Sequence, residues 1–163
     1  QRFVLHFMLT GAPDYIDDLK KIAEQICPGR VFFEPAVKPD EIAAAISRFD
    51  MGVYILPPNS FNDLHAMPNK FFDFVGAGLA VAVAPSVNMA KITRDNHIGW
   101  VADDFEAESF AKLLNTITLD QIETRRAASL KLRETINART EMGKLVELVE
   151  RVAAGKPKKT ASG

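Results

Sequence analysis

The chain has 163 residues, 47% hydrophobic and 25% charged, a length and composition that suit one ordinary globular domain. Its 20 Lys and Arg are balanced by 21 Asp and Glu, which excludes the basic surplus expected of a general nucleic-acid binder. The single cysteine, Cys27, excludes an internal disulfide and fits a reducing compartment, and no apolar run reaches membrane-spanning length.

Apolar runs alternate with helical patterns along the chain, which indicates stacked strand–helix units around a mainly parallel sheet. The predicted strands lie at residues 3–9, 31–33, 51–56, 79–84 and 97–101. The predicted helices lie at residues 14–25, 38–46, 68–77, 88–93, 107–114 and, as one mostly continuous helix, about 119–153. Residues 79–84 are apolar without alternation, so we expect that strand to be buried on both faces.

These elements predict an α/β protein: a Rossmann-like doubly wound parallel sheet of about five strands, with flanking helices and a long carboxyl-terminal helix. The predicted domain covers residues 1–118, a helical extension covers 119–155, and a flexible tail covers 156–163. Gln1 leads almost at once into an apolar run, so we expect this chain to be cut from a longer protein, although a processed start predicts the same sequence.

The pattern that indicates a function lies in residues 51–84. It predicts a strand that ends at Pro57-Pro58, a polar loop at 59–67, a helix that ends at Gly78, and a buried strand. Ligands of open α/β sheets bind beyond the carboxyl ends of the strands, where this loop and the first turns of the helix are expected. The helix is predicted to begin at Pro68, a residue favoured at the first helical position.

Two faces are predicted for the helix after Pro68. Helical spacing forms a buried stripe from Phe71, Phe74, Val75 and Gly78. It also forms a small, polar face from Asn69, Asp73, Gly76 and Ala77.

Asp73 follows Lys70 by three residues and Asn69 by four, so one ligand could contact all three. A carboxylate can accept two hydrogen bonds from the vicinal hydroxyls of a ribose, and Lys70 with the helix N-terminus offers positive potential for a diphosphate. The alternative is a solvated Lys70–Asp73 pair on an ordinary surface helix, since such pairs are common and weak.

The frame of Pro68, Lys70, Asp73, Gly78 and the strand ending at Ala84 resembles the donor-binding segment of GT-B glycosyltransferases, in the variant with Pro-x-Lys before the acidic residue. The likeness covers about residues 3–115 and is densest over 31–84. It implies that Asp73 holds the ribose of a donor nucleotide sugar. The candidate donor site also includes Lys70, Asn69, Pro68 and His65. His65 lies in the polar loop and could contact the sugar or a phosphate, and a solvent-exposed loop histidine is the equal alternative.

Three features depart from the family pattern. His65 stands where many members carry a second glutamate that contacts the donor sugar, and Asp73 is one methylene shorter than the usual glutamate. The family's first strand–helix unit of this domain, which supplies an Arg and a Lys to the phosphates, is not recognisable. We therefore expect the domain to be incomplete at its amino end.

The resemblance implies the donor-binding half of a hexosyltransferase that moves a sugar from a UDP-, GDP- or similar nucleotide sugar to a glycan or glycolipid, as in polysaccharide biosynthesis. The acceptor site and catalytic base would belong to a missing amino-terminal domain. No catalytic residue is identified in this chain, so by itself it would transfer nothing. No metal or cofactor is implied. The expected location is the cytoplasm, including the inner face of the membrane by peripheral association.

Two other functions stay open: a sugar-nucleotide 2-epimerase-like domain, and a non-enzymatic doubly wound binding module. A phosphorylated receiver needs an aspartate at the end of the third strand, where this chain has Leu56-Pro57. Residues 10–13 supply neither the glycine turn of a dinucleotide dehydrogenase nor a phosphate-binding loop. The three histidines have no metal-ligand spacing, so a metal site is not predicted.

Overall fold

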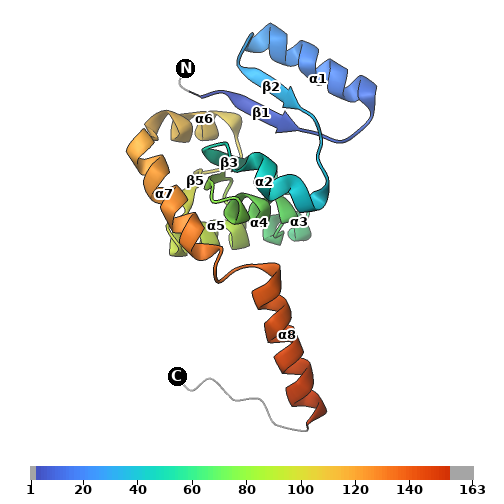
Figure 1. Ribbon diagram of the computed structural model, residues 1–163. Helices are drawn as coiled ribbons and strands as arrows, with labels where there is room; N and C mark the ends of the chain where they lie inside the picture. The colour runs from blue at the N-terminus through green and yellow to red at the C-terminus, as the bar shows by residue number, and fades with distance from the viewer. Residues whose placement is uncertain (1–2, 155–163) are drawn as a thin grey trace. The chain divides into compact units, whose positions relative to one another are not determined.

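The computed structural model describes residues 3–154, except for the side chains of residues 138, 139 and 141. It is an α/β protein with parallel strands, and the chain divides into two compact units, Gln1–Ala45 and Ile46–Gly163 (Figure 1). The prediction of an α/β fold with parallel pairing is confirmed. The predicted tail at residues 156–163 lies outside the described residues.

The first unit contains two parallel strands, β1 (Leu5–Met8) and β2 (Val31–Glu34), paired from Leu5↔Val31 to Met8↔Glu34. Helix α1 (Pro13–Ile26) connects them and ends, as predicted, before Pro28 and Gly29. The 3-10 turn η1 (Pro39–Glu41) and the short helix α2 (Ile42–Ile46) follow. No residue within the described range 3–45 is buried, so this unit has only an open apolar layer.

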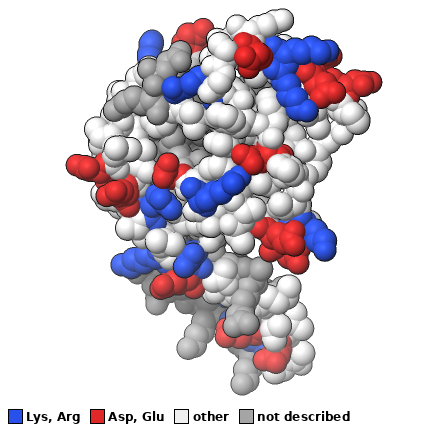
Figure 2. Space-filling model, turned by 45° about the horizontal axis from the view of Figure 1, so that its top comes forward, with Lys and Arg blue, Asp and Glu red and all other residues white. Residues whose placement is uncertain are grey.

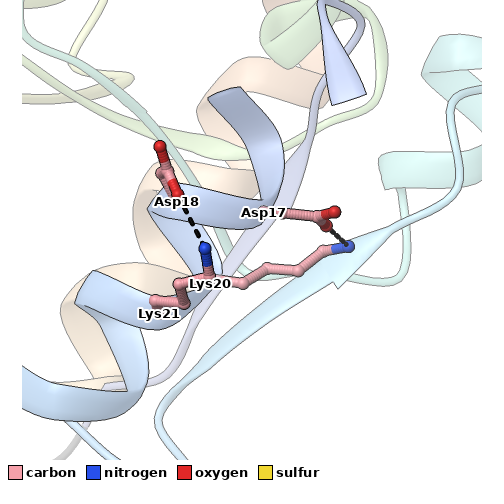
Figure 3. A network of polar contacts seen from close by, with 4 residues as sticks. All are labelled: Asp17, Asp18, Lys20 and Lys21. Atoms are coloured by element: carbon pink, nitrogen blue, oxygen red, sulfur yellow. Dashed lines mark hydrogen bonds and ion pairs between the residues drawn. The ribbon is translucent and has the colours of Figure 1, made fainter. Parts of the chain in front are cut away.

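The outer face of α1 carries two ion pairs, Lys20 to Asp17 and Lys21 to Asp18, each at 2.9 Å and each between residues about one helical turn apart (Figure 3). All four side chains are exposed to solvent, so these pairs contribute little to stability. The other face of α1 meets the two strands around an apolar hollow of about 220 Å³. That hollow is lined by Phe7, Leu19, Ile22, Ala23, Ile26, Cys27, Val31 and Phe33.

The second unit is built on a three-stranded parallel sheet in the order β3 (Met51–Tyr54), β4 (Ala80–Val83), β5 (Gly99–Val101). All four residues of the central strand β4 are fully buried, as its continuous apolar run predicts. The five strands within residues 3–154 thus pair as two sheets, and a single sheet of five strands stays a prediction.

Helices cover both faces of the three-stranded sheet. On one face, Val81 and Val83 pack in a core with residues of α4 (Asn69–Gly76), α5 (Val87–Asp95) and α7 (Leu119–Leu132). On the other face, Ala82 packs with Phe110 of α6 (Ala107–Thr116). Alternate residues of β4 therefore pack in two different hydrophobic cores, because successive side chains of a strand point to opposite faces of the sheet.

The carboxyl-terminal region differs from the predicted continuous helix. It forms α7 and then α8 (Ala138–Ala153), separated by residues 133–137. The oxygen Oδ1 of Asn137 accepts a hydrogen bond from the backbone N–H of Thr140 at 2.9 Å, which starts α8 as a new helix. The break arises because this asparagine caps a helix N-terminus instead of continuing the preceding helix.

Two further boundaries differ from expectation. The predicted polar loop at 59–67 contains a short helix, α3 (Phe61–His65). Its N-cap is Ser60, whose hydroxyl accepts from the N–H of Asp63 at 3.1 Å, while Asp63 accepts in return from the N–H of Asn59. Pro68 is the N-cap of α4 with extended backbone, so the helix begins one residue later than predicted.

Candidate functional site

The candidate site lies where the carboxyl ends of β3 and β4 meet. The two strands are parallel, and the connection between them contains α3 and α4, so α4 returns antiparallel to the sheet with its N-terminus at that edge. Helix α5 begins at the same edge: β4 ends at Val83, and Ser86, whose backbone N–H donates to the oxygen of Ala84, is the N-cap of α5. The N-termini of two helices therefore lie at the carboxyl edge of this sheet.

Helix α4 is held against the sheet by the predicted apolar stripe. Phe71 and Val75 are buried, Phe74 packs against the same core, and Gly78 is buried behind the helix. Gly78 has a φ of 72°, which favours glycine and ends the helix where predicted. The stripe is confirmed, and it fixes which side of α4 is left for a ligand.

Because an α-helix turns by about 100° per residue, Asp73 lies on the side of α4 opposite the stripe. Its side chain is half-buried, and burial raises the pKa of this carboxyl above its ordinary value. Within the described part of the chain no ion pair involves Asp73, so the alternative of a Lys70–Asp73 pair is not formed. A half-buried carboxylate without a cation keeps its hydrogen-bonding capacity for donors of another molecule.

The other predicted residues of α4 lie at its N-terminal end. Asn69 and Lys70 are exposed in the first turn, and Pro68 is half-buried at the N-cap. Helical spacing places Asn69 and Asp73 one turn apart, with Lys70 beside them. The helix thus brings an amide, an ammonium and a carboxylate to one end of α4.

His65 lies at the end of α3 and is half-buried. Its ring lies 4.2 Å from the ring of Phe61 on the same helix, centroid to centroid, and Phe61 is 75% exposed. Nδ2 of Asn88, in the first turn of α5, donates to the backbone oxygen of His65 at 2.6 Å. This bond joins the end of α3 to the start of α5, next to the start of α4.

Asn88 is the residue that sequence reasoning missed. The only signal in the sequence was the position of Asn88 in the first turn of a predicted helix. The partner of its side chain is the backbone oxygen of His65, 23 residues earlier in the chain. Asparagine is common near helix starts for local reasons, so its position alone did not indicate a contact with the loop before α4.

Two hollows lie away from the candidate site. One is the apolar hollow of the first unit, and the other is lined by Asp120, Gln121, Thr124 and Arg125 at the start of α7. Neither contains a predicted site residue. Among residues 3–154, no cluster of three or more His, Cys, Asp or Glu side chains could hold a metal ion.

The surface chemistry agrees with the near-zero net charge. On the face seen in Figure 2, Lys and Arg are interspersed with Asp and Glu and form no large patch of one sign. Within the described range, no helix combines the length and the apolar character needed to cross a bilayer.

Comparison with protein-family models finds none that matches this chain, and comparison with curated proteins finds no significant match.

Proposed function

We propose that this chain is the nucleotide-sugar donor-binding half of a GT-B-type glycosyltransferase. The observation that carries the proposal is Asp73, a half-buried carboxylate without a cation partner in the described range, on a helix that starts at the carboxyl edge of a parallel sheet. Two vicinal ribose hydroxyls would each donate to this carboxylate, and such charge-assisted bonds are stronger than neutral ones.

The diphosphate of the donor would lie toward the N-terminus of α4. Lys70 in the first turn supplies a positive charge, and the free N–H groups of a helix start add partial positive charge. The start of α5 lies at the same sheet edge and contributes in the same way. His65, held by Asn88, would contact the sugar side of the donor.

The proposed chemistry needs a second domain. A donor site of this kind binds and orients the leaving nucleotide, while the acceptor and the catalytic base come from the amino-terminal domain that the resemblance implies. We propose the chain as the binding half of a metal-independent enzyme, inactive alone. The finer fold, one doubly wound sheet of about five strands, belongs to the same proposal.

Isothermal titration of the chain with UDP-, GDP- and ADP-sugars tests the proposal. We expect one class to bind with a 1:1 stoichiometry and Asp73→Asn to weaken it about 10- to 100-fold, the loss of one or two charge-assisted hydrogen bonds. Asp95→Asn is the matched control, because Asp95 lies in the last turn of α5 and pairs with Lys91. If the folded chain binds none of these donors, the proposal fails.

The epimerase-like alternative uses a similar ribose-binding acid and predicts the same titration. Turnover of a sugar nucleotide without any acceptor, measured with the full-length protein, would favour that alternative. A folded chain that binds nucleoside diphosphates no better than it binds inorganic phosphate would favour a non-enzymatic module.

A further inference from the structure

Helix α3 presents an aromatic pair at the candidate site. Phe61 is the first residue of α3 and His65 is the last, so the two side chains lie on the same face of the helix, about one turn apart. Their ring centroids are 4.2 Å apart, with an angle of 32° between the ring planes. His65 is half-buried, whereas Phe61 is 75% exposed. The imidazole therefore packs against one side of the phenyl ring and leaves the rest of that ring open to solvent.

Other apolar side chains are exposed at the same edge of the sheet. Among the described residues 46–137, seven large apolar side chains are exposed, and four of them lie in the segments that follow the carboxyl ends of β3 and β4. These four are Ile55, Leu56, Phe61 and Val87. Val87 begins α5 and precedes Asn88, whose side chain holds the backbone of His65. Exposed apolar side chains at the ligand edge of an α/β sheet favour contact with an apolar part of a ligand.

Hydrogen bonds within α3 hold the helix that carries the pair. The hydroxyl of Ser60 accepts from the N–H of Asp63, and the carboxylate of Asp63 accepts from the N–H of Asn59. Asp63 is the acidic residue of α3, and this bond engages it in the start of the helix. The aromatic surface of Phe61 is therefore the main feature that α3 offers to a ligand.

The order of groups along α4 indicates which part of a donor lies near this pair. In a nucleotide sugar, the diphosphate separates the ribose from the transferred sugar. If Asp73 holds the ribose and Lys70 contacts the diphosphate at the start of α4, the sugar continues beyond that start. Three residues separate the end of α3 from the start of α4, and the end of α3 is bonded to the first turn of α5. This order favours the sugar over the base as the group that meets Phe61.

We propose that the open side of Phe61 is a platform on which the pyranose ring of the donor sugar lies. The proposal rests on the proposed function and extends it to the way in which the sugar is recognised. A pyranose with equatorial hydroxyls presents C–H groups on its faces and hydroxyls at its rim. A face can therefore pack on an aromatic ring while the hydroxyls keep their water. The ligand class is a nucleoside diphosphate linked to a pyranose, and the sugar-free diphosphate does not reach Phe61.

Paired titrations of the whole chain isolate this contact. UDP-glucose is compared with UDP, GDP-mannose with GDP, and ADP-glucose with ADP, and the pair that binds most tightly is used for the variants. We expect Phe61→Ala to weaken the nucleotide sugar about 10-fold and to leave the sugar-free diphosphate unchanged, whereas Phe61→Trp keeps the platform and the affinity.

Leu119→Ala is the matched control, because Leu119 is also the first residue of a helix, α7, and is 76% exposed. It should change neither affinity. Alanine favours a helix more than phenylalanine does, so α3 is expected to persist in Phe61→Ala, and circular dichroism checks the fold.

Proton NMR of the bound ligand gives a second readout. The ring current of Phe61 should move the pyranose protons upfield in the complex with the parent chain, and this shift should vanish in Phe61→Ala. The inference is overturned if Phe61→Ala weakens both ligands of the pair equally or neither of them, or if the base protons carry the shift instead. Those outcomes leave the donor site itself intact. A folded chain that binds no diphosphate and no nucleotide sugar refutes the donor site and the platform together.

Discussion

Phe74 occupies the space that a side chain at Gly52 would need. A Cβ atom added to Gly52 in β3 would lie 2.2 Å from Cγ of Phe74 in α4. Gly52 is buried, so the ring of Phe74 lies directly against the backbone of the strand. The helix that carries Asp73 is therefore positioned by a glycine two elements earlier in the chain.

Substitution of Gly52 should destabilise the fold. We expect Gly52→Ala to lower the free energy of unfolding by about 1–3 kcal/mol, because the methyl group must displace a packed aromatic ring. Gly76→Ala in α4 is the matched control: nothing lies within 4 Å of its added Cβ, and alanine favours a helix by about 0.5–1 kcal/mol. Urea denaturation measures both changes, and an equal effect of the two substitutions would contradict the packing argument.

Asp73→Asn should not weaken the fold at neutral pH. Burial raises the pKa of Asp73 in the folded state, so the ionised carboxylate opposes folding. The stability of the parent protein therefore falls as pH rises from the ordinary value of 3.8 through the raised value, and the penalty is complete above it. The asparagine variant should be as stable as the parent below pH 3.8 and more stable at neutral pH. Thermal unfolding across this pH range measures the difference; a variant less stable at neutral pH would assign Asp73 a structural role.

Lys70 should affect donor affinity through charge alone. We expect Lys70→Met to weaken the binding of the donor identified by titration about 5- to 10-fold, because one positive charge beside a diphosphate is lost. The loss should shrink at high salt, since this side chain is exposed. Lys91→Met removes a lysine of α5 that pairs with Asp95 and should leave affinity unchanged. Equal losses for the two variants would show that overall charge, and not position, matters.

Loss of the Asn88 side chain should loosen α3. Its hydrogen bond to the backbone oxygen of His65 is 2.6 Å long and partly buried, and α3 has only five residues to sustain itself. We expect Asn88→Ala to speed amide hydrogen exchange in residues 61–66 with little change in β4. Asn62→Ala, an exposed position on α3 itself, serves as the control. Unchanged exchange in α3 would mean that contacts with α5 other than this bond hold the short helix.

Thr93 carries a buried hydroxyl that has no hydrogen-bond partner among the described residues. Thr93→Val keeps the shape of the side chain and removes the unpaired polar atom. We expect the free energy of unfolding to rise by about 1 kcal/mol, the cost of desolvating such a group. Thr124→Val, at an exposed position of α7, is the comparison, because the Thr124 hydroxyl donates to the backbone oxygen of Asp120. A destabilised Thr93→Val variant would indicate that the hydroxyl has a partner in solution.

Local patterns predicted most of the strands and helices and several of the faces that they bury, although they missed α3 and the break between α7 and α8. The unbroken apolar run of β4 predicted burial on both sides, and the spacing of Phe71, Phe74 and Val75 predicted the stripe of α4. Both follow from the fixed periods of strands and helices, which any short stretch of sequence displays. The α/β class with parallel strands followed from the order of the elements.

Only the tertiary structure decided which distant residues meet. The pairing of the strands as two sheets, the bond from Asn88 to His65, and the close approach of Phe74 to Gly52 join residues far apart in the chain. The chain breaks before α8 because Asn137 caps the N-terminus of a new helix instead of continuing the preceding one, and hydrophobic periodicity does not predict such a cap. The half-burial of Asp73, on which the proposed function depends, is likewise set by the packing around α4, whereas sequence fixes only its place on the helix.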